Sequence, residues 1–155
     1  MVYQNHPSLL QIQFQIHGLN KNDYKLVLEI WEKSVKQTHD FLAEADFNFY
    51  KAIIPENLDE VKLYLWEDNG EIVGFSGVSA EELVMLFLDP DFIGKRYGSQ
   101  ILIELIETED IKRIDVNSQN KYAKHFYLSH GFEIESEEDL DGFGKPYPIT
   151  HLVKK

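Results

Sequence analysis

Residues 83–107 read LVMLFLDPDFIGKRYGSQILIELIE, and this stretch decides the fold. Its first six residues, 83–88, are all apolar, which is typical of a short strand buried on both faces of a sheet. Pro90 ends that strand, because proline cannot donate to a sheet ladder. Apolar residues then recur at helical spacing between positions 101 and 106. The chain therefore predicts a buried strand, a glycine-bearing loop and a helix, in that order.

The loop between that strand and that helix has two interpretations. It contains Gly94 and Gly98 with Lys95 and Arg96 between them. The free amides of a helix N-terminus beside basic residues favour an anion, most often a phosphate. The glycines could equally serve only to turn the chain, since the loop fits neither the Walker motif nor the G-x-G-x-x-G dinucleotide motif.

Composition restricts the class of protein. With 155 residues, 43% of them apolar, the chain is long enough for one domain over residues 1–155 with a real core. The absence of cysteine excludes disulfides, thiolate zinc sites and a cysteine nucleophile. No run of eighteen apolar residues and no signal pattern occur, so we expect no membrane association and a cytoplasmic location.

Charge narrows the choice of partner. The formal net charge of −12 argues against nucleic acid, which binds clustered lysine and arginine. It is compatible with a cationic acceptor such as an amine, although it could simply keep the protein in solution. The Lys95-Arg96 pair is a local basic site in this acidic chain, and a polyanionic ligand would require such a site. His125, His130 and His151 fall on different elements, so we expect no metal site.

The first part of the chain predicts one strand and two helices. Apolar residues alternate over 10–16, which indicates a half-buried strand at one side of the sheet, closed by Gly18. Asn20 resembles a helix cap before an apolar helical stripe at 24–35. After a break at Ser34–His39, a second helix is expected over 40–53, ended by Pro55.

The remaining elements follow from local signals. Asn69-Gly70 predicts a two-residue type I′ hairpin between strands at 61–65 and 72–78. A short strand at 113–116 precedes a helix with Asn120 as its cap and Gly131 at its end. Strands then resume at Phe132 and at 147–153, joined by an acidic connection. The expected order is β-α-α-β-β-β-α-β-α-β-β. The predicted fold is therefore α/β (α+β), with a mixed, largely antiparallel central sheet and helices on both faces.

Two motifs give the chain a resemblance to the GCN5-related N-acetyltransferases. Residues 86–100 resemble motif A, in which a buried strand leads into Q/R-x-x-G-x-G/A. Only Gly98 matches that pattern, because Ile93 and Arg96 stand at the first and fourth positions. Motif B, V-x-x-x-N-x-x-A-x-x-F-Y-x-x-x-G-F, is filled at every fixed position over 116–132.

The resemblance extends beyond these motifs. It covers Val61 to the C-terminus, and the stretches THDF (38–41) and GKPYPITHL (144–152) resemble a subgroup of small bacterial acetyltransferases, the YjaB type. The resemblance implies the acyl-CoA acyltransferase fold, with the fourth and fifth strands splayed apart to admit acetyl-CoA.

The resemblance also implies where acetyl-CoA is held. The fourth strand holds the pantetheine arm through its backbone at Leu86, Phe87 and Leu88. Loop amides hold the pyrophosphate, and two basic side chains of the loop add charge. Those loop residues are Gly94, Lys95, Arg96, Tyr97, Gly98 and Ser99. Asn120 contacts the cofactor in addition to capping its helix, whereas for Asn117 a role in the turn is favoured.

Two side chains are candidates for proton transfer. Direct transfer of an acetyl group from a thioester to an amine needs no covalent intermediate and no metal, but it needs a base and an acid. Tyr127 is the candidate acid, because a phenol stays protonated at neutral pH; its alternative role is core packing. His39 is the candidate base, because histidine titrates in the useful range and the resemblance puts the acceptor wall of the family between the two early helices, where His39 lies; its alternative role is that of a surface residue paired with Asp40 in a loop.

Two classes of function remain open at this point. One is an acetyl-CoA-dependent N-acetyltransferase, and the other is an acyl-CoA-binding sensor or partner module without turnover. The acceptor is also open among polyamines, aminoglycosides, amine drugs, peptide N-termini and protein lysines. A homodimer is common in the family, and no sequence feature decides for or against it.

Overall fold

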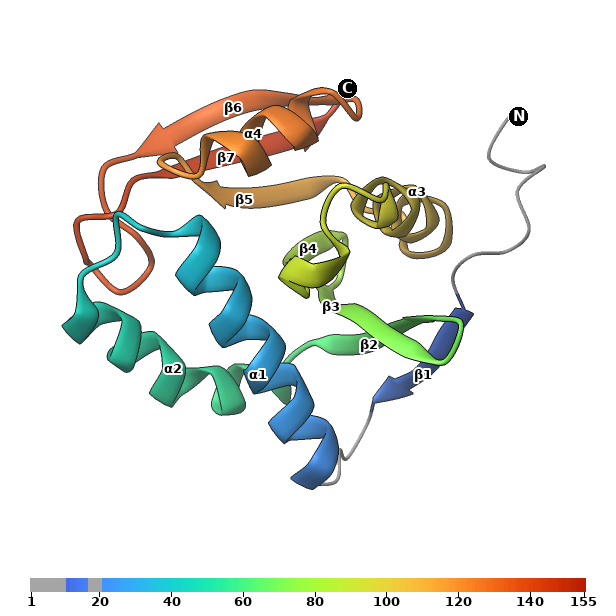
Figure 1. The fold of residues 1–155 in the computed structure, drawn as a ribbon. Helices are drawn as coiled ribbons and strands as arrows, with labels where there is room; N and C mark the ends of the chain where they lie inside the picture. The colour runs from blue at the N-terminus through green and yellow to red at the C-terminus, as the bar shows by residue number, and fades with distance from the viewer. Residues whose placement is uncertain (1–10, 17–20) are drawn as a thin grey trace.

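The computed structural model describes residues 11–16 and 21–155. Seven strands form one sheet in the order β1-β2-β3-β4-β5-β7-β6 (Figure 1). All neighbouring strands are antiparallel except β4 and β5, so the mixed, largely antiparallel sheet is confirmed. In chain order the elements are β1 (Gln11–Ile16), α1 (Lys21–Thr38), α2 (Glu44–Leu58), β2 (Lys62–Asp68), β3 (Glu71–Ser79), β4 (Glu82–Leu88), the 3₁₀-helix η2 (Pro90–Phe92), α3 (Tyr97–Glu109), β5 (Arg113–Asn117), α4 (Lys121–Leu128), β6 (Phe132–Glu138) and β7 (Ile149–Lys154).

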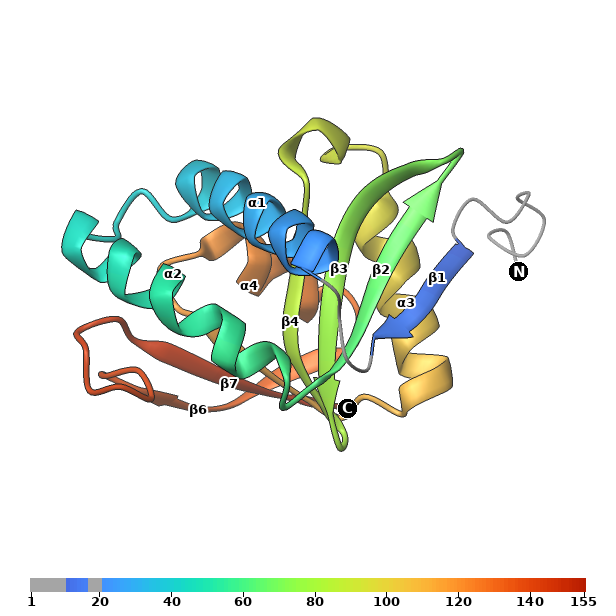
Figure 2. The ribbon, with the colours of Figure 1, turned by 90° about the horizontal axis from the view of Figure 1, so that it is seen from below.

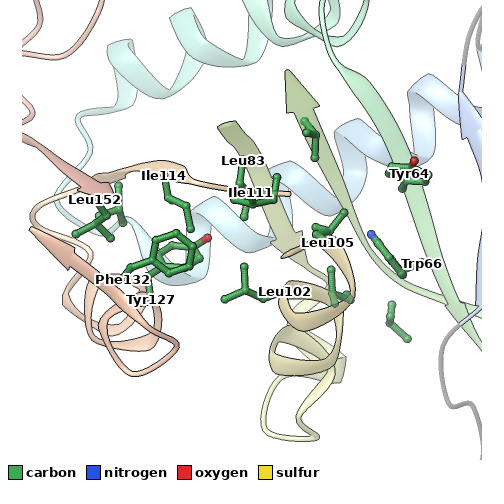
Figure 3. Close-up of a cluster of buried hydrophobic side chains, with 14 residues drawn as sticks. Tyr64, Trp66, Leu83, Leu102, Leu105, Ile111, Ile114, Tyr127, Phe132 and Leu152 are labelled. Atoms are coloured by element: carbon green, nitrogen blue, oxygen red, sulfur yellow. The ribbon is translucent and has the colours of Figure 1, made fainter. Parts of the chain in front are cut away.

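Helices cover both faces of the sheet, as predicted (Figures 1 and 2). Helices α1 and α2 pack on β2–β4, where Trp31, Leu63 and Phe75 belong to one buried cluster. Helices α3 and α4 pack on the opposite face, where Leu102 and Phe132 belong to a second cluster, drawn in Figure 3. Each large apolar side chain that is removed from water stabilises the fold by about 1.5–3 kcal/mol before entropy is counted.

The local turn signals are confirmed. Asn69 and Gly70 have φ values of 52° and 79°, the two positive angles that a type I′ turn requires between β2 and β3. Strand β1 pairs only with β2 in the described ladder and lies at the edge of the sheet, as its alternating pattern predicted. Leu10, Gly18 and the expected cap Asn20 lie outside the described residues.

The boundaries of the first two helices differ from the prediction. Helix α1 continues to Thr38, because Ser34 and Val35 are buried on its inner face, so the break lies at 39–43. Helix α2 begins at Glu44 and runs through Pro55, which was wrongly expected to end it. Proline removes one hydrogen bond to the preceding turn. The helix continues nevertheless, because Ile54 just before the proline and Leu58 one turn later are buried in the core.

Strands β4 and β5 separate soon after they begin. Their ladder contains only Glu82 with Arg113 and Leu83 with Ile114. Beyond Leu83, the edge of β4 that faces β5 has no ladder partner in the described part of the chain. Figure 2 shows β7 and β6 running away from β4. We call the separation beyond these two pairs the β4–β5 gap, and it confirms the splayed strands that the resemblance implied.

No helix in the described ranges, 11–16 and 21–155, is both long enough and apolar enough to cross a membrane.

Candidate active site

The first turn of α3 presents free amides beyond the end of β4. The first backbone bond of the helix runs from the Gln100 amide to the Arg96 carbonyl, at 3.2 Å. The amides of residues 97–99 therefore precede the helical bonding pattern. The side chains of that turn bind elsewhere: the Tyr97 hydroxyl donates to Asp68 at 2.5 Å, and Ser99 Oγ lies 2.6 Å from His130 Nε2. Backbone groups are what this turn offers to an anion.

Arg96 has an unusual backbone conformation. It precedes α3 with φ 68° and ψ 13°, the left-handed region, which explains why the motif usually has glycine there. The conformation costs an L-residue roughly 1–2 kcal/mol. The side chain is exposed, as is that of Lys95, whose Nζ lies 5.5 Å from the Phe92 ring centroid. The Arg96 side chain therefore does not fill the loop, and both basic residues directly precede the free amides in the chain.

Substitutions of Arg96 separate its charge from its backbone strain. We expect Arg96→Ala and Arg96→Gly to weaken CoA binding by roughly twofold to tenfold, and to weaken pantetheine binding much less, because only CoA carries the phosphates. Arg96→Gly should also raise the free energy of unfolding by about 0.5 kcal/mol, since it removes the strain at a cost in chain entropy. Calorimetry with CoA, dephospho-CoA and pantetheine measures the first effect, and denaturant unfolding the second.

Arg96→Lys is the control for the Arg96→Ala and Arg96→Gly variants, because it keeps both the positive charge and the strained backbone conformation. It should bind CoA nearly as the parent protein does. Equal or tighter CoA binding by Arg96→Ala would mean instead that the long side chain obstructs the loop.

The outer edge of β4 completes a place for an extended ligand. The backbone of Leu86, Phe87 and Leu88 pairs with β3 on one side and faces the β4–β5 gap on the other. Unpaired strand groups followed by helix N-terminal amides match, in order, the amide-bearing arm and the pyrophosphate of CoA. The chain therefore offers CoA a set of groups that fits its chemistry.

Tyr127 lies on α4, between the core and the gap. Its side chain is 7% exposed, and its ring packs against Phe126 and Phe132, with centroids 5.3 and 6.5 Å away. The hydroxyl has no hydrogen-bond partner within residues 11–16 and 21–155. In the same part of the chain, every fully buried polar side-chain atom does have a hydrogen-bond partner. The oxygen is therefore not completely enclosed by the described residues. Figure 3 shows it pointing from α4 toward the Leu83 and Leu102 side of the cluster. Burial raises the pKa of this phenol, so it is protonated at neutral pH.

Two asparagines order the segment that leads into α4. Asn120 Oδ1 accepts from the Ala123 amide at 3.2 Å, which confirms the predicted cap. Asn117 Oδ1 accepts from the Gln119 amide at 3.0 Å, which confirms its role in the turn. Gly131 has a φ of 90° just beyond the helix, as expected of its end residue. A contact between Asn120 and the cofactor remains a prediction.

A pocket of about 500 Å³ lies on the other face of the sheet, under α1 and α2. We call it the α1–α2 pocket. It includes Val84, Met85 and Phe87 of β4 and Asn117 of β5, so it reaches the β4–β5 gap from the face opposite Tyr127. Aliphatic side chains of α1, α2 and their flanking segments line much of the rest, and aromatic, acidic and histidine side chains join them, namely Trp31, His39, Tyr50, Glu60, Asp141, Phe143 and Tyr147.

The 139–148 loop between β6 and β7 closes one side of this pocket. The Tyr50 hydroxyl donates to Asp141, and the Tyr147 hydroxyl donates to Asp46. Lys145 Nζ lies 2.8 Å from Asp46 Oδ1, and the hydrogen bonds from Lys145 and Tyr147 lower the pKa of that carboxyl. Asp141 Oδ1 also accepts from two loop amides at 2.9 Å, so one carboxylate both folds the loop and attaches it to α2.

Sequence reasoning missed the polar residues of this pocket. Glu60 precedes β2, whereas Asp141 and Tyr147 belong to the 139–148 loop, and these two segments meet only in the folded chain. The stretch GKPYPITHL (144–152) resembles the YjaB type, but nothing in its spacing indicates that Tyr50 packs against Tyr147.

His39 lies where α1 ends, and its ring contributes to the α1–α2 pocket. Its backbone amide donates to the Val35 carbonyl at 2.8 Å, and its ring packs 5.2 Å from that of Phe41. Burial lowers the pKa of His39, and the nearby Asp40 charge opposes this shift more weakly. The imidazole is therefore neutral at pH 7, which is the form able to accept a proton. The structure places the two candidate groups, His39 and Tyr127, on opposite faces of the sheet, each beside the β4–β5 gap.

Known proteins resemble this chain in both sequence and structure. A family model described as "Acetyltransferase (GNAT) domain" matches residues 59–134. The peptidyl-lysine N-acetyltransferase YjaB of Salmonella typhimurium is 33% identical over 128 residues, which cover 82% of this chain and 88% of that relative. YjaB of Escherichia coli is 31% identical and covers 82% and 87% of the two chains.

Solved structures agree with the sequence matches. The solution structure of apo YjaB from Escherichia coli has a TM-score of 0.82 at 27% identity, and covers 94% of this chain and 97% of that one. An N-acetyltransferase from Thermoplasma acidophilum, solved with coenzyme A, shares the fold with a TM-score of 0.64 at 22% identity, covering 94% and 99%. This identity and coverage, together with the filled motif B, show that the chain belongs to the GCN5-related N-acetyltransferase (GNAT) family.

Proposed function

We propose that this acetyltransferase moves an acetyl group from acetyl-CoA directly to the ε-amine of a lysine side chain in a protein or peptide. The observation that carries the proposal is geometric: anion-binding amides and the α1–α2 pocket flank the same β4–β5 gap from different sides. The curated relatives named above as peptidyl-lysine N-acetyltransferases support lysine as the acceptor.

The donor side depends on backbone groups. The unpaired edge of β4 at 86–88 binds the pantetheine arm, and the first amides of α3 bind the pyrophosphate with Lys95 and Arg96 adding charge. Gly94, with a φ of 86°, and Gly98 give the loop its shape. Acetyl-CoA supplies the activated acetyl group, and the chain positions it at the gap.

The acceptor side suits a lysine. Aromatic side chains line the α1–α2 pocket, among them Trp31, Phe87 and Tyr147. They can pack against the methylene stem of a lysine and present ring faces to its ammonium group. The carboxylates of Glu60 and Asp141, and the net charge of −12, attract the ammonium form. Neutral His39 then takes a proton from that ammonium, directly or through water, because only the free amine is a nucleophile.

The departing thiolate requires a proton. The Tyr127 hydroxyl is protonated at neutral pH, has no hydrogen-bond partner among the described residues and is not completely enclosed by them. Tyr127 therefore serves as the general acid, while its ring packs in the core.

Peptide acetylation tests this function. The protein is incubated with acetyl-CoA and lysine-containing peptides whose N-termini are blocked. Thiol release and the mass gain on lysine are then measured. We expect acetyl-lysine to form at a rate proportional to enzyme concentration. Peptides with arginine in place of lysine are the control, and spermidine and an aminoglycoside report whether small amines compete.

The outcomes separate the alternatives. Thiol release with small amines but with no peptide would move the acceptor to that class. Saturable CoA binding without turnover on any amine would identify an acyl-CoA-binding module. If millimolar CoA leaves the melting temperature of the folded protein unchanged, the donor site described above does not exist.

A further inference from the structure

The His39 ring is attached to the last turn of α1 by a short chain of hydrogen bonds. Thr38 Oγ1 lies 2.7 Å from the Ser34 carbonyl oxygen, one helical turn earlier, and 2.7 Å from His39 Nδ1. Ser34 is 6% exposed, so its carbonyl belongs to a well-packed part of the helix. Both contacts have hydrogen-bond lengths, and together they determine where the protons are.

The carbonyl oxygen of Ser34 can only accept a hydrogen bond. The Thr38 hydroxyl proton must therefore lie between the two oxygens, since two unprotonated oxygens 2.7 Å apart would repel each other. A hydroxyl has one proton to donate, so toward His39 it can only accept. His39 Nδ1 must then carry a hydrogen and donate it to Thr38 Oγ1.

A neutral imidazole carries one ring hydrogen, so this arrangement places the lone pair of His39 on Nε2. No residue within 11–16 and 21–155 forms a hydrogen bond with that nitrogen. The free Nε2 belongs to a ring that lines the α1–α2 pocket, so it is available to a molecule bound there.

The other buried or bridged histidines of the described chain differ from His39. His130 Nδ1 lies 2.7 Å from the Phe126 carbonyl, and its Nε2 lies 2.6 Å from Ser99, so both nitrogens are occupied. His151 has a carboxylate on each nitrogen, from Asp115 and Glu138. His39 alone among these three combines a fixed Nδ1 with a free Nε2.

We propose that Thr38 is a positioning residue, which holds His39 in its Nδ1–H tautomer and thereby leaves Nε2 as the base for the acetyl acceptor. The inference rests on the proposed role of His39 in proton removal. Without the Thr38 oxygen, neutral imidazole distributes between its two tautomers, and the Nε2–H form cannot accept the proton of the amine. The effective population of the competent base then falls, and turnover falls with it.

The test compares Thr38→Val, which keeps the branched shape and removes the oxygen, with Thr38→Ser, which keeps the oxygen. Nitrogen-15 NMR of the histidine rings, recorded above their titration range, distinguishes the two tautomers directly. We expect His39 to be Nδ1–H in the parent protein and in Thr38→Ser, and to shift toward Nε2–H in Thr38→Val. The His130 signals should not change and serve as the internal control.

Kinetics supply the second measurement. Thr38→Val should lower kcat by roughly fivefold with the KM for acetyl-CoA unchanged, and Thr38→Ser should recover most of that loss. Should Thr38→Val fold poorly, Thr38→Ala removes the same oxygen with a better helix former. An unchanged His39 tautomer in the oxygen-free variants, or an altered tautomer with unchanged kcat, would overturn the proposal.

The two measurements also separate this proposal from the function on which it rests. The NMR measurement needs no acceptor, so it tests whether Thr38 determines the tautomer of His39 even if lysine is the wrong substrate. Full activity of a variant that lacks the His39 imidazole would instead refute the base itself.

Discussion

Tyr127→Phe is expected to lower turnover by roughly ten- to a thousandfold, while the affinity for acetyl-CoA and the melting temperature change little. The substitution keeps the ring that packs against Phe126 and Phe132 and removes only the hydroxyl. That hydroxyl has no hydrogen-bond partner among the residues that the structure describes, so its loss leaves no unpaired group behind. Steady-state kinetics, calorimetry with acetyl-CoA and thermal unfolding measure the three quantities.

Tyr122→Phe provides a matched control. Tyr122 lies on the same helix α4 but is 74% exposed, so its hydroxyl faces solvent. It should be fully active and fully stable. If Tyr127→Phe is stable and equally active, water or another side chain protonates the thiolate. If it is destabilised but fully active per folded molecule, Tyr127 is a core residue alone. Either result leaves the donor site standing, because that site consists of backbone groups.

His39→Gln is expected to lower kcat by roughly a hundredfold, which is a typical contribution of one general base to the rate. Glutamine keeps a polar side chain of similar size but cannot accept a proton at neutral pH. His125→Gln is the control, because His125 is an exposed histidine on α4, away from the α1–α2 pocket. If His39→Gln retains full activity, the base is another group of the pocket, and Glu60→Gln is then the variant to measure.

The pH dependence gives an independent check on His39. Burial lowers its pKa below the ordinary value of 6.5, so the base is formed as pH rises through that lowered pKa. The acid limb of kcat/KM should therefore fall below pH 6.5 in the parent protein and disappear in His39→Gln. The free energy of unfolding depends on pH in the same direction. Because the unfolded histidine binds its proton more readily, the contribution of His39 to stability rises with pH through about 6.5.

Short-range signals in the sequence predicted those parts of the fold that depend on neighbouring residues. Asn69-Gly70 determined its hairpin and Asn120 its helix cap, because in each case the residues that decide the conformation are adjacent. Pro55 failed as a helix end for the opposite reason. The energy of burying Ile54 and Leu58 comes from residues on other elements, which a local rule does not include.

The same distinction applies to the candidate site. The β4 strand and the loop at 93–98 are contiguous, so the donor side could be predicted from one stretch. The left-handed conformation of Arg96 could not, because arginine rarely adopts it. The α1–α2 pocket joins residues from 31 to 149, and its polar groups face one another only after the 139–148 loop binds to α2.

The division of the site by the sheet has an evolutionary consequence. The proposed donor side is built mainly from one contiguous block, β4 through α4, whereas the proposed acceptor side comes mostly from α1, α2 and the 139–148 loop. If the α1–α2 pocket binds the acceptor as proposed, mutations at positions such as Tyr50 or Phe143 change which amine is accepted without altering the binding of the acetyl donor. Selection can act on the two specificities separately, so a lineage with this architecture can acquire a new acceptor while it inherits the donor chemistry intact.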